Sequence, residues 1–596
     1  MHAPARLKAP SAWQPPRGCL LALLALLVLL ALQLAPAVAS AASISAACSG
    51  TKGDAASLAG AITLANSDPG PDTVVLGAGC TYTLTSVNNY WYGPNGLPAI
   101  SSDVTIAGNG ATIARSPFAP DFRLLFVGAD PGNPDTLGYA SPGPGRLTLS
   151  DVTLSGGIAQ GGGSDRGGGG AGMGGAIFSQ GTVEIDHSTL TANLAQGGAS
   201  SEMSAIGGSG GGIGTSAGVS GGGFGASSLG GGAGGSGGGD TTGGGGGGGG
   251  FATTEGGGAA TQSSPPGQGG GPQTGLGGAG AAPNGVGVTG GAAGDGAGGG
   301  GGGGIVTGSP TNFAVGGAGG AFGDGGDVGD GGGGGGVGGG GGGPGGNGGG
   351  GGGGFGGGGG FGGDGGGASG TGFGAGGAGG FGAGGGGGAG GGGAGGFGGG
   401  TGTATDGGGG AGLGGAVFNM QGQLTVTDVT FTANSAVGGT SAGPNPGSGM
   451  GGAVFNMSGS LTATDSTFAA NSADHDGDAI YNLVYDAHTA RTAQTTLRGT
   501  IVAGQGASTD LVSDRSASIQ PAPLGSADAD VSLFDLVRTL AARGQGTITG
   551  PAFSSADPLL GPLQNNGGLT QTMAPWPGSP ALDAVPVNAA VCLLLR

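Results

Sequence analysis

The feature that most constrains this chain is a short phrase that recurs on both sides of a long glycine-rich stretch. Each copy begins Gly-Gly-Ala, continues with Ile or Val and then Phe, and closes on Asn after an alternating segment. The copies are Gly174–Asn193, Gly414–Asn434 and Gly451–Asn471. A repeated unit of this size is the signature of a solenoid, whose units stack because none buries its apolar side chains alone.

Setting the copies in register reveals apolar and polar columns. One apolar column holds Val183, Leu424 and Leu461, and a second holds Ile185, Val426 and Ala463. Polar residues stand between them, and this period of two is typical of a strand with one buried face. The copies therefore predict an all-β protein, a parallel β-helix whose rungs lie ~4.8 Å apart.

Two further columns give specific expectations. Asn193, Asn434 and Asn471 should form a buried amide ladder at a turn, and the rings of Phe431 and Phe468 should stack inside the coil. On the polar side, Thr425 and Thr462 begin a grid of hydroxyls that Glu184 interrupts.

Between the first and second copies lies the stretch that carries most of the 173 glycines. It offers no material for an apolar core, and glycine costs the most backbone entropy to order. Two interpretations remain open, disorder and a bundle of polyglycine-II-like strands with three residues per turn. Asp324, Asp327 and Asp330 fit a period of three, as do Phe355, Phe361, Phe373 and Phe397, whereas Phe381 does not.

The N-terminus indicates export. Arg6, Lys8 and Arg17 precede the apolar run Cys19–Leu34, and small residues follow at Ala37–Ala41, so we expect a signal peptide at 1–39. Its removal takes away three of the 14 Lys and Arg residues and leaves all 33 Asp and Glu residues. Such an acidic chain is a poor partner for nucleic acid, and no second stretch is long and apolar enough to span a membrane.

Export also makes a disulfide between Cys48 and Cys80 plausible, with two unrelated thiols as the alternative. The two cysteines bracket Ala55–Asn66, where Leu58, Ala61 and Ile62 are spaced like one face of a helix. The bridge would fasten this helix to the first rung.

We divide the chain into a signal peptide (1–39), an N-terminal cap with the first coils (40–155), a glycine-rich insertion (156–411) that contains one coil (172–197), and the repeat coils (412–505). An irregular segment (506–544) and a closing segment (545–596) follow. Within the irregular segment, Val531–Arg543 spaces Leu536, Val537 and Leu540 like an amphipathic helix.

Several motifs resemble known families. The pairs Gly414–Val417 with Phe431–Asn434, and Gly451–Val454 with Phe468–Asn471, resemble the repeats of chlamydial polymorphic membrane proteins. Cys48 with Ser57–Ile62 is similar to the CSLREA-type segment of secreted bacterial β-helix proteins. Asp557–Gly568 with Gly578–Asp583 resembles the closing motif of choice-of-anchor proteins, and the glycine stretch is similar to that of mycobacterial PGRS proteins. The resemblance implies an exported right-handed β-helix.

The carboxylates and histidines are the candidates for a catalytic or metal-binding site. His187, His475 and His488 stand outside the motifs of polysaccharide hydrolases, and Asp428 and Asp465 align without a basic partner, which favours turn-capping roles. Asp474, Asp476 and Asp478 alternate as calcium ligands do, although a solvated turn is the simpler interpretation. The sequence predicts no other cofactor.

We therefore expect an exported bacterial cell-surface or matrix protein that is structural or adhesin-like and not an enzyme. Its glycine-rich module would be a spacer or adhesive surface, and its partners would be cell-surface glycans or other surface proteins. The alternatives are a carbohydrate-active β-helix enzyme, a polysaccharide lyase or hydrolase, and a hydroxyl array that binds ice or glycans.

Overall fold

The computed structural model describes residues 41–68, 70–129, 141–201, 210–214, 216, 353, 375–485, 491–506, 508–515, 525–532, 534–550, 554–582 and 584. The chain divides into two compact units, Met1–Ala41 and Ala42–Arg596, and nearly all described residues belong to the second. The expected signal peptide, most of the glycine stretch including Asp324, Asp327 and Asp330, and His488 lie outside the described residues. Among the described residues no helix is long and apolar enough to cross a membrane.

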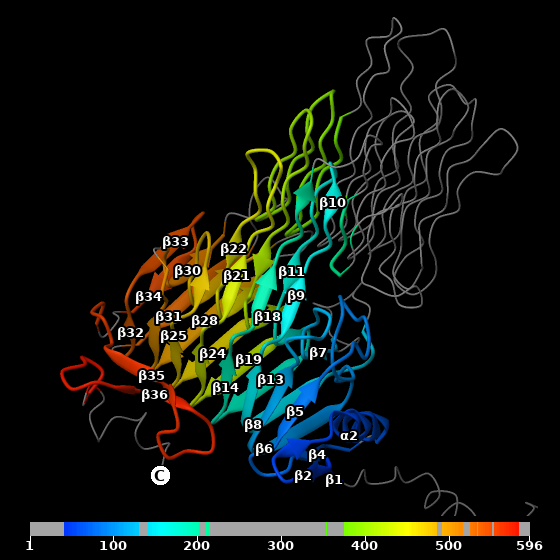
Figure 1. Cartoon of the computed structure of the whole chain (residues 1–596). Coiled ribbons are helices and arrows are strands. Elements are labelled where there is room, and N and C mark those ends of the chain that lie inside the picture. The colour runs from blue at the N-terminus through cyan, green and yellow to red at the C-terminus, as the bar shows by residue number, and fades with distance from the viewer. Residues whose placement is uncertain are drawn as a thin grey trace, which may run out of the picture. The chain divides into compact units, whose positions relative to one another are not determined.

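The N-terminal cap forms because one helix closes the open end of the strands (Figure 1). Asp54 caps α2 (Ala55–Ser67) by accepting bonds from the backbone N–H groups of Ala56 and Ser57. The expected apolar face is confirmed, since Leu58, Ala61, Ile62 and Ala65 are its buried residues. The cap strands are β1 (Ser43–Ser45), β2 (Cys48–Ser49), β3 (Lys52–Gly53), β4 (Asp72–Val75) and β5 (Thr81–Leu84).

Strands stack in parallel from the cap toward the C-terminus. Two long strands, β6 (Asp103–Arg115) and β8 (Arg146–Ser155), bend midway. The first half of each strand belongs to one ladder of paired strands and the second half belongs to another. The first ladder continues from β1, β4, β6 and β8 through β13 (Thr182–Asp186), β19 (Gln423–Thr427), β24 (Ser460–Thr464), β28 (Thr492–Arg498), β31 (Ser526–Val531) and β34 (Thr547–Thr549). The second continues from β3, β5, β6 and β8 through β14 (Thr189–Thr191), β20 (Thr430–Thr432), β25 (Thr467–Ala469), β29 (Ile501–Ala503) and β32 (Leu536–Val537).

A separate parallel sheet, which we call the aromatic sheet, is buried on both faces except at its last strand. It consists of β7 (Leu125–Val127), β12 (Ile177–Ser179), β18 (Val417–Met420), β23 (Val454–Met457), β27 (Ile480–Leu483), β30 (Leu511–Asp514) and β33 (Leu540–Arg543). Ile177, Val417 and Val454 join the interior core, whereas Phe178, Phe418 and Phe455 belong to a second core on the other face. Burial on both faces explains why the Gly-Gly-Ala-Ile/Val-Phe phrase is an unbroken apolar run.

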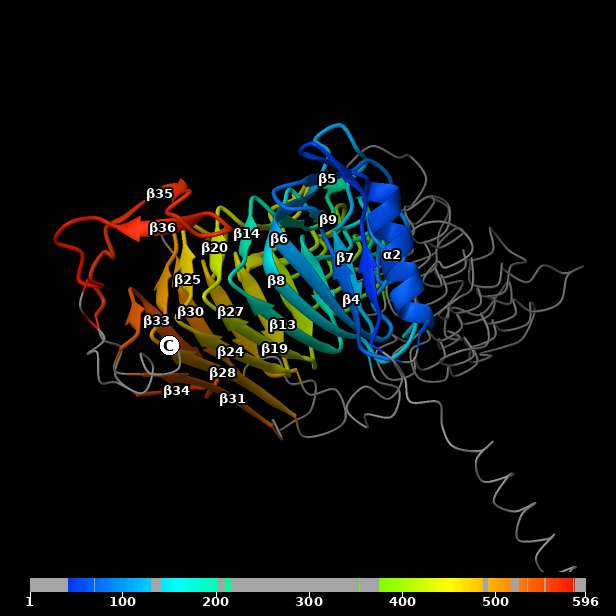
Figure 2. The same ribbon diagram turned by 90° about the horizontal axis from the view of Figure 1, so that it is seen from below.

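Shorter strands complete each coil. One sheet holds β9 (Ile158–Gln160), β15 (Leu194–Gln196), β21 (Ser435–Val437) and β26 (Ser472–Ala473), another holds β11 (Gly172–Met173), β17 (Gly412–Leu413) and β22 (Gly449–Met450), and β10 (Ser164–Asp165) pairs with β16 (Ser200–Ser201). The antiparallel pair β35 (Leu560–Gln564) and β36 (Thr572–Pro575) lies beside β14 (Figure 2), where Thr570 donates to the carbonyl of His187.

The coils on either side of the glycine-rich insertion are direct neighbours, as expected. β13 pairs in parallel with β19, Val183 opposite Leu424 and Ile185 opposite Val426. Two coils can stack although a long insertion separates them in sequence, because each strand edge needs a partner. The entropic cost of closing a loop grows only logarithmically with its length. The protein is therefore an all-β chain of stacked parallel sheets, compatible with a β-helix-like solenoid.

The expected helix at Val531–Arg543 is wrong. This segment ends β31 and then forms β32 and β33, with Leu536 opposite Ile501 and Leu540 opposite Leu511. The strand edges of β29 and β30 would otherwise stay unpaired, and backbone pairing with them outweighs the helical spacing of the leucines. The parallel ladders thus run on past residue 505 to β34.

Candidate functional site

The interior columns behave as the alignment indicates. The rings of Phe431 and Phe468 are fully buried and stacked, with centroids 4.6 Å apart and planes 5° apart. The side-chain amide of Asn193 donates to Asn434 at 2.9 Å, and that of Asn434 donates to Asn471 at 2.9 Å. These two expectations are confirmed, and they show that the coils are in register.

A second amide ladder was not expected. Asn419 donates to Asn456 at 2.7 Å, and Asn456 donates to Asn482 at 2.7 Å, all three side chains being buried. Asn419 and Asn456 follow the Phe of the second and third Gly-Gly-Ala phrases, and Asn482 follows Tyr481, so a column of an aromatic residue and Asn was the available signal. Both ladders link buried side-chain amides from coil to coil, which is a structural role.

Cys48 and Cys80 are joined by a disulfide. Cys48 lies in β2 and Cys80 directly precedes β5, and an added Cβ at Gly77 would meet both cysteines, so the surrounding chain is tightly packed.

The three aspartates considered for calcium have separate protein partners. Asp474 accepts bonds from the backbone N–H groups of Gly438 and Gly449, and Asp476 pairs with Arg543 at 2.7 Å. Asp478 is buried and accepts bonds from the backbone of Ala473 and the hydroxyl of Ser508. Across the described part of the chain, no group of three His, Cys, Asp or Glu side chains is placed to hold a metal ion.

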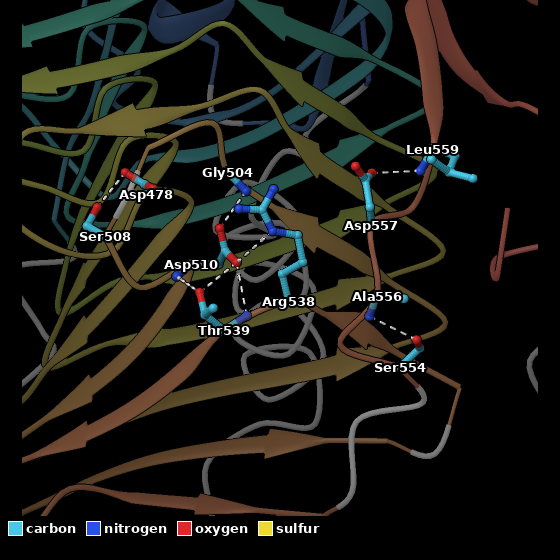
Figure 3. Close-up of polar contacts among 10 residues, drawn as sticks. All are labelled: Asp478, Gly504, Ser508, Asp510, Arg538, Thr539, Ser554, Ala556, Asp557 and Leu559. Atoms are coloured by element: carbon cyan, nitrogen blue, oxygen red, sulfur yellow. Dashed lines mark hydrogen bonds and ion pairs between the residues drawn. The ribbon is translucent and has the colours of Figure 1, made fainter.

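Figure 3 shows Asp478 and Ser508 beside a second capping aspartate, Asp510. The Asp510 carboxylate accepts bonds from the Gly504 N–H at 2.6 Å and from the Thr539 hydroxyl at 2.7 Å, with Arg538 3.9 Å away. Burial raises the pKa of Asp510, although these bonds oppose the shift. We interpret both aspartates as turn caps in the last coils.

Asp428 and Asp465 occupy matching turns of adjacent coils, and both have positive φ angles, 54° and 49°. His187 lies on the preceding coil, with its Nε2 3.4 Å from the Asp428 carboxylate, a partner that the sequence did not suggest. The pKa of Asp465 is raised to about 6, first by burial and then by the charges of Asp428 and Asp535. A carboxyl titrating there would be suited to donate a proton near neutral pH.

The polar side of the first ladder is an uneven grid. Glu184 lies opposite Thr148 and Thr425, and Thr462 and Thr496 follow. Glu184 pairs with Arg146 on the neighbouring strand. The carboxylate thus interrupts the hydroxyl column, as the sequence indicated.

The described glycine strands are hydrogen-bonded at every third residue. Residues 375–403 run back and forth through turns at 381–382, 389–390 and 397–398. Gly376, Gly379, Gly382, Gly385 and Gly388 donate in turn to the carbonyls of Gly391, Ala394, Phe397, Gly400 and Thr403 at 2.8–3.0 Å. Other strands join the same network, since Gly410 donates to Gly198 and Gly198 to Gly170.

These strands can pack this closely because glycine has no side chain. A Cβ added at Gly169, Gly198 or Gly410 would lie 1.9–2.0 Å from a carbonyl oxygen of a neighbouring strand. We call these hydrogen-bonded segments (160–170, 197–198, 375–410 and 438–449) the glycine layer.

Aromatic rings fasten the glycine layer to the aromatic sheet. Phe381 and Phe397 occupy two of its turns, stacked 5.6 Å apart. Each lies 6.4 Å from Phe455, which continues the column Phe178, Phe418, Phe455 and Tyr481. Figure 1 shows the green glycine turns rising next to β10, β11 and β22. The second core is thus shared between the coils and the glycine layer.

Comparison of the chain with protein-family models, with curated proteins and with solved structures finds no match in any of the three.

Proposed function

We propose that this chain is an exported bacterial cell-surface or matrix protein with a structural or adhesin-like role and no catalytic activity. A right-handed parallel β-helix would form its body, and the glycine layer would be a polyglycine-II-like bundle that serves as a spacer or adhesive surface.

The observation that carries the proposal is the three-residue spacing of the hydrogen bonds within the glycine layer. A polyglycine-II strand has three residues per turn and places a donor on the same side at every third residue, as in Gly376 and Gly379 of one strand and Gly385 and Gly388 of the next. A bundle of this kind is rigid without an apolar interior of its own, because it is anchored through Phe381 and Phe397. An ordered, glycine-rich surface suits contact between surfaces better than it suits an enclosed reaction site.

The in-register coils support the proposal that the body is a parallel β-helix. Asn193 and Asn434 are 241 residues apart in sequence and adjacent in the ladder. Strand-to-strand columns of identical residues are what a β-helix with a lateral insertion requires.

One observation favours a carbohydrate-active enzyme as a second candidate. Asp428 lies beside His187, and burial and the charge of Asp428 raise the pKa of Asp465, which would let Asp465 act as a general acid. A hydroxyl array is less well supported because Glu184 divides it.

The test displays the full chain on a bacterial surface next to two variants, a deletion of 199–410 and a full-length chain carrying Gly198→Val with Gly410→Val. We expect both variants to keep β-rich circular dichroism while losing attachment to mucin-coated plates and cell–cell aggregation. The deletion should also expose Phe178, Phe418 and Phe455 and bind a hydrophobic dye.

Release of reducing sugar from polysaccharide by the full chain, abolished by Asp465→Asn, would instead establish the enzyme. Unchanged attachment by both variants would refute the role of the glycine layer.

N-terminal sequencing of the exported protein checks the export step, with Ser40 or Ala42 expected as the first residue.

A further inference from the structure

A polar groove crosses the coils on the side of the first ladder and has no part in the proposed function. It has a volume of about 450 Å³ and is lined by the turns that precede β8, β13, β19 and β24 and by residues of β28. Its lining includes Gln180, Gln421, Gln423, Ser460, Gln494 and Arg146. None of these residues belongs to the glycine strands at 375–410.

The groove follows the stacking direction. Arg146 lies opposite Thr182, Thr182 opposite Gln423, Gln423 opposite Ser460, and Ser460 opposite Gln494. Adjacent strands lie ~4.8 Å apart, so the groove presents one polar side chain about every length of a sugar ring. A linear ligand lying along it would meet equivalent groups at successive coils.

Two glutamines beneath the groove lack partners for their polar atoms. Gln421 is 8% exposed, and neither its side-chain oxygen nor its nitrogen has a hydrogen-bond partner. Gln180 is 2% exposed, its side-chain oxygen has no hydrogen-bond partner, and its side-chain nitrogen donates to the sulfur of Met420. Buried amides without partners cost stability. Rotation about their side-chain bonds would bring both amides to a ligand in the groove.

The chemistry of the lining specifies an uncharged, hydroxyl-rich ligand. Amides and hydroxyls both donate and accept hydrogen bonds, which matches the vicinal hydroxyls of sugars. Arg146 is the one charged residue of the lining, and its guanidinium pairs with Glu184. A polyanion would therefore find no free cation there.

We propose that this groove binds a linear neutral oligosaccharide, with its chain along the stack of coils. Gln423 and Gln494 would contact the ligand from the exposed rim, and Gln180 and Gln421 from the floor. This inference goes beyond the proposed function and does not depend on the glycine layer.

The test is calorimetric titration of the full exported protein with cellohexaose, maltohexaose and mannohexaose, with hexagalacturonate as the charged comparison. At least one neutral hexasaccharide should bind with a Kd below about 1 mM. Gln423→Ala with Gln494→Ala should weaken that binding about tenfold or more, because each loses a hydrogen bond. Gln160→Ala, an exposed glutamine of β9 outside the groove, should bind as the wild type does.

Gln421→Met separates binding from folding. It removes an unpartnered buried amide at similar volume, so we expect a higher Tm together with weaker binding of the same hexasaccharide. The proposal is overturned if no neutral probe binds below that Kd, if only hexagalacturonate binds, or if the groove variants bind with unchanged affinity.

Discussion

At the scale of single residues, the cost of a substitution follows from the column that the residue occupies. Phe431, Phe468 and the amide ladders face the interior and contact their counterparts in the coils before and after. A change at one of these positions therefore affects three coils at once. Exposed residues of similar size make no such contacts.

Phe468→Ala should lower the free energy of unfolding by about 3–5 kcal/mol, since it removes a fully buried ring and leaves a cavity beside Phe431. Chemical denaturation measures the change. Phe118→Ala is the matched control, because Phe118 is 97% exposed, and it should alter stability by less than about 0.5 kcal/mol. Equal effects of the two changes would contradict the register.

The raised pKa of Asp465 predicts that the free energy of unfolding depends on pH. Its pKa is raised to about 6 in the folded protein, whereas an unfolded chain has a pKa of about 3.9 for Asp. The folded state therefore holds the proton more tightly, and the free energy of unfolding falls as the pH rises from about 4 to about 6. Asp465→Asn removes this contribution and should flatten the profile in that window. An unchanged slope in denaturation curves of the variant would show that Asp465 does not titrate there.

At the scale of elements, glycine has opposite consequences in the cap helix and in the glycine layer. Gly60 lies in α2 with open space where a Cβ would stand, whereas a Cβ at Gly410 would lie 1.9 Å from the carbonyl oxygen of Gly170. The same substitution should therefore have opposite signs at the two positions.

Gly60→Ala should stabilise the protein by about 0.5–1 kcal/mol by reducing the entropy lost on helix formation. Gly410→Ala should destabilise it by about 1–3 kcal/mol, because two backbones must separate. Thermal unfolding of the two variants tests the pair. A neutral effect of Gly410→Ala would mean that these strands are not in contact.

The elements that the sequence predicts well are those with in-register side chains. The strands around Val183, Leu424 and Leu461, the face of α2 and the Asn193 ladder all follow from periodicity and alignment. The strands at Val531–Arg543 could not be predicted this way, because their conformation depends on the unpaired edges of β29 and β30. The groove was also missed, although Gln180 and Gln421 each stand three residues before the aligned pair Val183 and Leu424, because alignment alone does not show which turn positions line a groove.

At the scale of the whole molecule, the coils and the glycine layer share one core. The coils supply Phe178, Phe418 and Phe455, and the glycine layer supplies Phe381 and Phe397. The aromatic sheet can be apolar on both faces because the glycine layer covers the outer one. Each layer consequently stabilises the other.

Amide hydrogen exchange over residues 375–410 of the intact protein tests this central claim most directly. The amides of Gly379, Gly382 and Gly385 donate to neighbouring strands, so they should exchange orders of magnitude more slowly than in a free glycine-rich peptide. Gly410→Ala should accelerate their exchange, and Gly60→Ala should not. Exchange of residues 375–410 at the rate of the free peptide would contradict the existence of an ordered glycine layer.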